Sequence, residues 1–125
     1  MIIKNNIEIW KIDFKNLITH LIYNSYNDTY YILYKMNNLI IVRHGQSIWN
    51  KEKRFTGWVD VDLTEHGKSE AKLAGQLIKE LNIKFDIYFT SVQKRAIHTI
   101  EIIMDVLNKK NSEIKKAWEL NERHY

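Results

Sequence analysis

A histidine between an arginine and a glycine, directly after a short apolar run, is the strongest chemical signal in the sequence. The run is residues 39–42, and Arg43, His44 and Gly45 follow it. A neutral imidazole is a nucleophile, and a hydrogen bond from its other ring nitrogen orients it. A neighbouring guanidinium can hold a phosphoryl group through its planar set of N–H donors. These residues indicate phosphoryl-group chemistry, although the same histidine alone would fit a structural role equally well.

Two short apolar segments predict strands that place this motif. Residues 39–42 form a short apolar run rich in β-branched side chains, as in a strand buried on both faces. Residues 85–89 are predicted to form a second strand, and residues 117–120 are a candidate third. Strands that alternate with helices are typical of a parallel sheet, whose ligands bind at the carboxyl ends of its strands. Arg43 and His44 fall at that edge.

Two helices are predicted between the strands. One begins at the N-cap Thr64, and its apolar residues recur at helical spacing as far as Leu81. The other begins with Thr90 or Ser91 as its cap, and its apolar face ends at Leu107. The sequence therefore predicts an α/β fold, a three-layer sandwich in which helices flank a mainly parallel sheet.

The first 35 residues differ in composition from the rest of the chain. They lack Gly, Ala, Val, Arg and Pro, and Ile, Asn, Tyr and Lys dominate them. These are residues with AT-rich codons, and Met36 offers a later start. We predict that residues 1–35 are a non-native or disordered N-terminal extension, with an arm for pairing or for a membrane surface as the alternative. Residues 36–125 are predicted to form the N-terminal part of one domain.

Composition excludes several classes of protein. Without cysteine, the chain can have neither a disulfide scaffold nor a thiolate metal site. No apolar run approaches the roughly 18–20 residues that cross a membrane. The net charge of +4 suits an anionic partner, but the basic residues are scattered, and no Lys/Arg-rich run indicates nucleic acid. Neither a membrane, nor nucleic acid, nor a metal is therefore expected as a partner.

Four segments of the chain combine into a more specific pattern. They are Arg43-His44-Gly45, then R-F-T-G-W at 54–58, F-T-S-V-Q-K-R-A at 89–96, and N-E-R-H-Y at 121–125. In this order they resemble the 2,3-bisphosphoglycerate-dependent phosphoglycerate mutases of the histidine phosphatase superfamily. The first segment is shared across the superfamily, whereas the Thr-Gly-Trp loop and the last run are typical of the mutases.

The resemblance implies a role for each matching residue. His44 would become a phosphohistidine, and Arg43 and Arg95 would hold the phosphoryl group during transfer. Glu122 would exchange a proton with the substrate hydroxyl. The other implied substrate contacts are Gly45, Gln46, Ser47, Ile48, Trp49, Asn50, Thr56, Gly57, Arg123, His124 and Tyr125.

The resemblance also implies an activity and a setting. The family interconverts 3-phosphoglycerate and 2-phosphoglycerate in glycolysis and gluconeogenesis, with 2,3-bisphosphoglycerate as the primer of the phosphoenzyme and with no metal. A cytoplasmic homo-oligomer is expected. The family carries a second histidine and further basic phosphate ligands in later segments, which the sequence up to Tyr125 does not contain. We therefore expect a truncated version of the fold, with weak or no mutase activity in the 125-residue chain itself.

Two other functions remain open at this point. A phosphatase of the same superfamily would pass the phosphoryl group from His44 to water. A non-catalytic remnant or binding module would hold phosphorylated metabolites without phosphorylation of His44. The Thr56-Gly57-Trp58 loop favours the mutase over the phosphatase.

Overall fold

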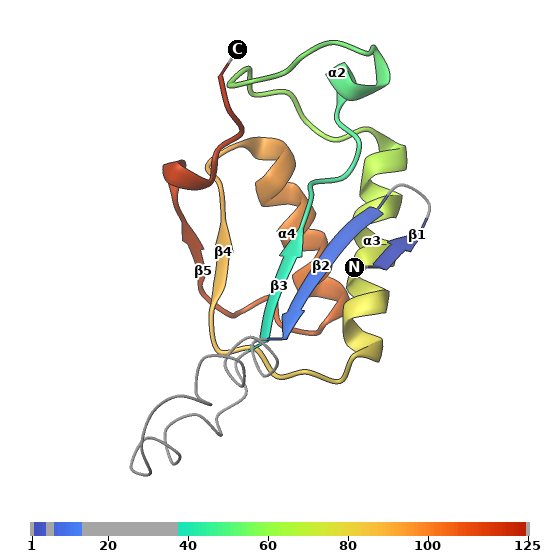
Figure 1. Ribbon diagram of the computed structural model, residues 1–125, viewed down its shortest axis with the longest axis vertical. Helices are drawn as coiled ribbons and strands as arrows, with labels where there is room; N and C mark the ends of the chain where they lie inside the picture. Colours follow the sequence, from blue (N-terminus) through green and yellow to red (C-terminus); the bar gives the residue numbers. More distant parts are fainter. Residues whose placement is uncertain (1, 5–6, 14–37, 125) are drawn as a thin grey trace, which may run out of the picture.

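The fold was analysed in a computed structural model, which describes residues 2–4, 7–13 and 38–124 (Figure 1). Its elements follow one another in this order: β1 (Ile2–Lys4), β2 (Ile7–Asp13), β3 (Asn38–Val42), α2 (Ile48–Lys51), α3 (Glu65–Glu80), β4 (Tyr88–Thr90), α4 (Lys94–Val106), β5 (Ile114–Lys116) and the 3₁₀ helix η1 (Trp118–Leu120).

The strands form two separate sheets. β2 lies between β1 and β3 and pairs antiparallel with both, with Ile9 opposite Val42 in β3. β4 pairs in parallel with β5, and Tyr88 lies opposite Ile114. β3, β4 and β5 all run upward in Figure 1, so their carboxyl ends point toward the side of the molecule on which α2 and the C-terminus lie. The parallel pair with its helices confirms the predicted α/β class.

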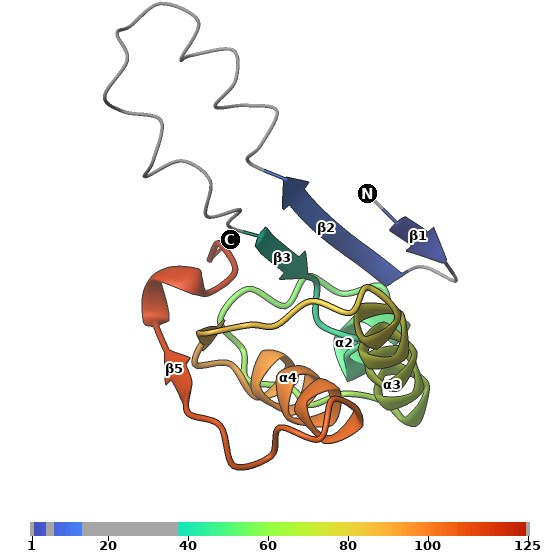
Figure 2. The same ribbon diagram turned by 90° about the horizontal axis from the view of Figure 1, so that it is seen from below.

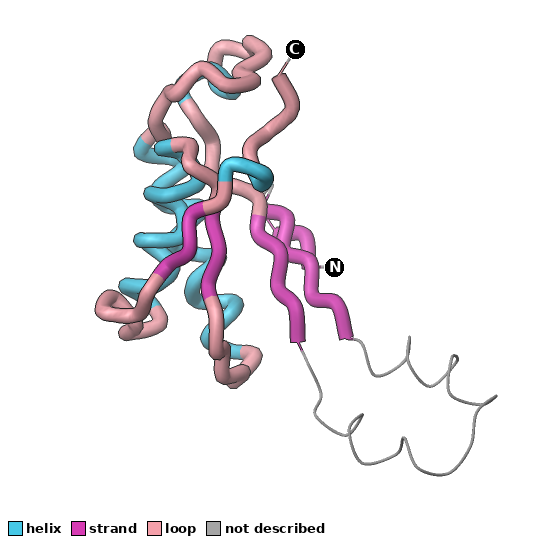
Figure 3. The backbone as a smooth tube through the Cα atoms, turned by 90° about the vertical axis from the view of Figure 1, so that its left-hand side faces the viewer, coloured by secondary structure: helices cyan, strands magenta, loops and turns pink. Residues whose placement is uncertain are grey.

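Both long helices cover the same face of the strands (Figures 2 and 3). The core between them is formed by Ala74, Ile78 and Ile103, against which Ile40 and Val42 of β3 pack. Side chains alternate along a strand, so their neighbours on β3 point the other way. A second helical layer over that opposite face is not present among the described residues.

The predicted helices are both present, but only one begins as expected. The Thr64 hydroxyl accepts a hydrogen bond from the amide of Gly67 at 3.0 Å, which caps α3 as predicted. The prediction that Thr90 or Ser91 caps the second helix is wrong. Thr90 is the last residue of β4, and the N-cap of α4 is Gln93, whose side chain makes no capping hydrogen bond.

The predicted third strand at residues 117–120 is also wrong. The parallel strand is β5, three residues earlier, and the amide of Ala117 still donates to the carbonyl of Thr90 at 2.9 Å. The chain then turns into η1, where the amide of Leu120 bonds back to Ala117. The apolar side chains of Trp118 and Leu120 therefore lie exposed at a turn and do not belong to a strand.

β1 and β2 fall within the predicted N-terminal extension, and residues 14–37 lie outside the described residues. The pairing of β2 with the edge of β3 does not test whether residues 1–35 belong to the native protein, and that statement stays a prediction. None of the helices described here has the length and apolar character that crossing a membrane requires.

Candidate active site

His44 lies where β3 ends, and its ring is held in one orientation. Nδ1 lies 2.7 Å from the carbonyl oxygen of Gly45. A carbonyl can only accept, so Nδ1 of the neutral ring carries the proton and Nε2 keeps its lone pair. Nε2 in turn accepts a hydrogen bond from Nε of Arg95 at 3.2 Å. The unprotonated ring nitrogen of His44 therefore faces a guanidinium.

The surroundings of His44 favour the neutral ring. Burial lowers the pKa of His44 below its ordinary 6.5, and the positive charges of Arg95 and Arg43 lower it further. The hydrogen bond to the carbonyl of Gly45 opposes this shift, but it does not reverse it. An imidazole with a lowered pKa is uncharged at neutral pH, which is the state that can attack phosphorus.

Arg95 links three separate segments of the chain. Its side chain is 0% exposed. Nη1 donates to the carbonyl of Val59 at 3.1 Å, and Nη2 donates to the carbonyl of Gly57 at 2.8 Å. Nη2 also pairs with the carboxylate of Glu122 at 2.9 Å. His44, Arg95 and Glu122, which were predicted to share one site, are thus connected through a single guanidinium.

The Thr-Gly-Trp loop and the C-terminal segment are docked against each other. Gly57 has a φ of +51°, a conformation that favours glycine, and a Cβ there would lie 3.2 Å from Nδ1 of His124. The indole of Trp58 donates to the carbonyl of Glu122 at 2.8 Å, and its ring lies 5.3 Å from that of His124. Trp58 therefore helps to hold the backbone of Glu122.

Thr56 carries a buried hydroxyl without a partner. The residue is buried, and its Oγ1 makes no hydrogen bond to the protein. Buried polar groups are nearly always satisfied, so an orphan in a loop next to a candidate site indicates a group supplied by a ligand. The substrate contact of Thr56 stays a prediction.

The turn after His44 is backed by both long helices. The amide of Gly45 donates to the hydroxyl of Thr99 at 3.1 Å, and the amide of Gln46 donates to the carboxylate of Glu70 at 2.7 Å. Gly45 and Gly67 also approach so closely that a Cβ on either would overlap backbone atoms of the opposite segment. Two glycines are therefore needed for α3 to support the turn.

Replacement of Gly67 by alanine tests this close approach. In an ordinary helix this change stabilises by about 0.5–1 kcal/mol. Here the new methyl group would overlap the carbonyl of Gln46, a backbone atom that cannot rotate away. We expect the free energy of unfolding to fall by about 1–3 kcal/mol, measured by urea denaturation. Lys72→Ala, on the exposed side of α3, is the matched control. A Gly67→Ala chain that is as stable as the wild type would contradict the close approach.

Several residues predicted to bind substrate have other contacts in this structure. Ser47 and Asn50 form a reciprocal capping box on α2, in which each side chain bonds the backbone amide of the other. The guanidinium of Arg54 stacks on Trp49, with Cζ of Arg54 3.8 Å from the centre of the indole ring. Ile48 is an exposed member of α2, and Tyr125 lies outside the described residues.

The amides at the start of α4 are also engaged by the protein itself. The amide of Lys94 donates to Asp60 at 2.7 Å, and that of Gln93 donates to the hydroxyl of Ser91 at 3.4 Å. The basic side chains and the buried hydroxyl are therefore the stronger candidates for anion binding.

Sequence reasoning missed three side chains that support the site. Thr99 and Glu70 hold the turn after His44, and Gln93 contacts the backbone of Glu122. Thr99 follows Arg95 by four residues, a spacing that places both side chains on one face of a helix and could have indicated Thr99. Nothing in the sequence alone indicated the contacts of Gln93 and Glu70.

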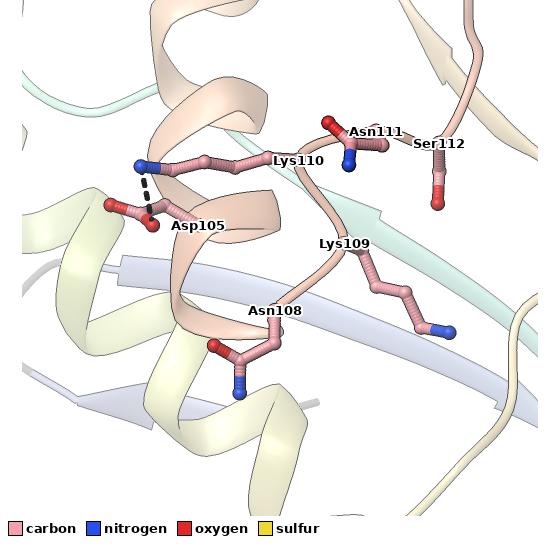
Figure 4. Close-up of a pocket in the computed structure, with 6 residues that line it drawn as sticks. All are labelled: Asp105, Asn108, Lys109, Lys110, Asn111 and Ser112. Atoms are coloured by element: carbon pink, nitrogen blue, oxygen red, sulfur yellow. Dashed lines mark ion pairs between the residues drawn. The ribbon is translucent and has the colours of Figure 1, made fainter.

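A shallow hollow at the other end of α4 is not part of this site (Figure 4). It is lined by Asp105 and residues 108–112. Lys110 pairs with Asp105 at 2.8 Å, whereas the side chain of Lys109 points away from both. The two lysines do not converge on a ligand. No group of three or more potential metal ligands occurs in the described part of the chain.

Comparison with known proteins identifies relatives of this chain. The histidine phosphatase superfamily (branch 1) profile matches residues 39–125. A 2,3-bisphosphoglycerate-dependent phosphoglycerate mutase from Hamiltonella defensa subsp. Acyrthosiphon pisum (strain 5AT) is 56% identical over 90 residues, which are 72% of this chain and 36% of that protein. The chain thus spans about a third of the length of this relative.

Solved structures agree on the fold. A phosphoglycerate mutase from Bacillus anthracis str. Sterne superposes with a TM-score of 0.60 at 30% identity, over 64% of this chain and 34% of that one. A phosphoserine phosphatase from Entamoeba histolytica, solved in complex with 3-phosphoglyceric acid, gives 0.54 at 30% identity, over 64% and 36%. The predicted fold class is therefore confirmed.

Proposed function

The chain belongs to the histidine phosphatase superfamily, and we propose that the protein is a 2,3-bisphosphoglycerate-dependent phosphoglycerate mutase with His44 as its nucleophile. The observation that carries the proposal is the connection of His44, Arg95 and Glu122 through hydrogen bonds of one buried guanidinium. A nucleophile, a phosphate holder and a proton donor are thereby brought together. The name of the relative that is 56% identical supports the choice of substrate.

The proposed chemical step follows from these positions. Nε of Arg95 turns from Nε2 of His44 to a phosphoryl oxygen, which releases the lone pair on Nε2. This lone pair forms a bond to the phosphorus of a phosphate monoester, and the bond from phosphorus to the ester oxygen breaks. The leaving oxygen takes a proton from Glu122, and the charge on the phosphoryl oxygens is balanced by Arg95 and Arg43. The reverse step delivers the phosphoryl group to the other hydroxyl of the substrate, while Glu122 takes a proton back.

The residues present suit a bisphosphorylated primer. The unpartnered hydroxyl of Thr56 and the cation of Arg95 are both donors for phosphate oxygens, and His44 accepts the transferred group. When bound, 2,3-bisphosphoglycerate would supply the phosphoryl group that primes His44. The remaining predicted contacts, including Arg123 and His124 in the C-terminal segment, stay part of the proposal. So do the cytoplasmic setting and the homo-oligomeric assembly.

A phosphatase of the same superfamily is the second candidate. The carboxylate of Glu122 is 40% exposed, so water can reach the proton acceptor of the hydrolytic step. Similarity to a phosphoserine phosphatase is consistent with this alternative. Because the chain spans about a third of the mutase it resembles, we also propose that the 125-residue chain alone has weak or no mutase activity.

The decisive experiment follows the phosphoryl group. The full-length gene product is incubated with 3-phosphoglycerate and a trace of 2,3-bisphosphoglycerate, and both 2-phosphoglycerate and inorganic phosphate are quantified. Formation of 2-phosphoglycerate supports the mutase, whereas inorganic phosphate without isomerisation supports the phosphatase. Binding of the primer without labelling of His44 would replace both with a non-catalytic binding role.

The pH dependence of phosphoenzyme formation tests the state of His44. Because burial and neighbouring arginines lower its pKa, the ring should stay neutral and reactive as the pH falls to 6.5. With p-nitrophenyl phosphate as the donor, the labelling rate should decline only below that value, after correction for the titration of the donor's own phosphate at about pH 6. A half-maximal rate at or above pH 6.5 would contradict the lowered pKa.

A further inference from the structure

Gln93 occupies a buried position between the two segments that build the site. It is the N-cap of α4 and only 5% exposed. Its amide nitrogen donates to the carbonyl of Gly57 at 2.8 Å, and its amide oxygen accepts from the backbone N–H of Glu122 at 3.3 Å. One side chain thus bonds the Thr-Gly-Trp loop and the C-terminal segment at the same time.

The backbone of Glu122 has few other restraints. The residue follows η1 in a segment without regular hydrogen bonding. Its carbonyl is held by Trp58, which is itself 54% exposed, and its neighbour Asn121 accepts from the amide of Val92 at 3.1 Å. A buried hydrogen bond is less open to competition from water than an exposed one. The contact with Gln93 is part-buried whereas the other two are exposed, so it is the best protected of the three hydrogen bonds in this segment.

Through the carbonyl of Gly57, Gln93 is also connected to Arg95. The carbonyl of Gly57 accepts from both Gln93 and Nη2 of Arg95, and Nη2 pairs with the carboxylate of Glu122. Gln93, Gly57, Arg95 and Glu122 therefore form a closed ring of contacts, from the backbone of Glu122 to its own side chain. A ring of this kind fixes where the carboxyl group lies relative to His44.

We propose that Gln93 is a positioning residue that holds Glu122 in place to protonate the oxygen leaving phosphorus. The proposal rests on the proposed function, because it assigns to Glu122 the proton transfer of that reaction. Gln93 itself touches neither the nucleophile nor any reacting atom, and its effect passes through the backbone of Glu122.

The leaving group provides a readout that general loss of structure would not imitate. An alkyl phosphate expels an alkoxide, which needs a proton from Glu122 as the bond breaks. p-Nitrophenyl phosphate expels a stabilised phenolate that needs none. In both cases Nε2 of His44 bonds to phosphorus and the ester oxygen leaves. A displaced Glu122 should therefore slow the first donor and spare the second.

The test compares Gln93→Leu with Gln76→Leu, an exposed glutamine on α3 that serves as the control. Labelling of His44 in the full-length gene product is timed with 2,3-bisphosphoglycerate and with p-nitrophenyl phosphate. Since a general acid contributes about 10²–10⁴-fold, partial misplacement in Gln93→Leu should slow the alkyl donor by about 10–100-fold. The aryl donor should change less than about threefold. Equal slowing of both donors, or of neither, would overturn the proposal.

A second measurement does not depend on activity. Hydrogen exchange of the Glu122 amide should accelerate at least about tenfold in Gln93→Leu, while the Gly45 amide, which donates to Thr99, should keep its rate. Gln93→Glu, which retains the acceptor for Glu122, should exchange more slowly than Gln93→Leu. An unchanged Glu122 amide would refute the positioning role. A wild type that neither donor labels would contradict the proposed function instead, and the exchange rates would still decide whether Gln93 holds Glu122.

Discussion

His44→Asn is expected to lower the rate of phosphoenzyme formation by at least about 10⁴-fold, because the change removes the atom that bonds to phosphorus in the proposed step. Asparagine is a close match for the half of the ring that contacts the backbone. Its amide N–H can still donate to the carbonyl of Gly45, as Nδ1 does in the wild type. The substitution therefore deletes Nε2 with little change to the turn.

The measurement is the amount of phosphate attached to the peptide that contains residue 44, determined by mass spectrometry after incubation with p-nitrophenyl phosphate. A phosphoramidate at histidine is lost in acid and retained in base, which distinguishes it from a phosphate ester. His66→Asn is the matched control, since His66 is an exposed histidine of α3. Undiminished labelling of His44→Asn would transfer the nucleophile to another residue.

The same variant carries a stability signature. The folded chain holds His44 with a lowered pKa, so the unfolded chain binds more protons below the ordinary value of 6.5. Wild-type stability should therefore decrease as the pH falls below 6.5, and the loss should level off once the pH is below the folded pKa. In His44→Asn this part of the pH dependence disappears, whereas in His66→Asn it remains.

The sequence predicted the parts of the fold that depend on local chemistry. Thr64 precedes an apolar pattern of helical period, and the structure confirms both the cap and α3. The strand before Arg43 was also predicted, because consecutive β-branched residues favour a β-strand. The position of β5 could not be predicted from the sequence. The last hydrogen bond of this pairing joins the amide of Ala117 to the carbonyl of Thr90, which is distant in the sequence.

The site divides in the same way. His44, Arg95 and Glu122 were recognisable by residue type and order, and the structure connects them. The partners that orient them were not, because Gln93 and Thr99 are recognisable only once the loop and α4 are in contact. Arg95 itself lies on the buried face of α4 together with Ile103 and Met104.

Arg95→Met should damage both the fold and the chemistry, and the two effects can be separated. Methionine fills the space of the side chain but donates no hydrogen bond, so Nε2 of His44 and the carboxylate of Glu122 lose the guanidinium. The carbonyls of Gly57 and Val59 each lose one of two donors, because Gln93 and the amide of Val61 still bond to them. Each unsatisfied buried group costs about 1–3 kcal/mol, but Glu122 is partly exposed and can recruit water. We expect a net loss of about 3 kcal/mol in the free energy of unfolding.

The chemical effect should be larger than the loss of stability explains. Removing a preorganised donor from a phosphoryl site costs about 10²–10³-fold in rate, and Arg95 also orients Glu122. We therefore expect labelling of His44 to fall by about 10³-fold under conditions in which urea titration shows the variant folded. Arg54→Met, an exposed arginine stacked on Trp49, is the control and should match the wild type in both assays.

Arg95→Lys distinguishes charge from geometry. An ammonium keeps the positive charge, but it is a compact donor without the planar fork that reaches Gly57, Val59 and Glu122 together. If the fork is what assembles the site, lysine should recover less than about a tenth of the wild-type labelling rate. Full recovery by lysine would mean that Arg95 acts through its charge alone, and the hydrogen bonds that connect the three segments would then have no part in the reaction.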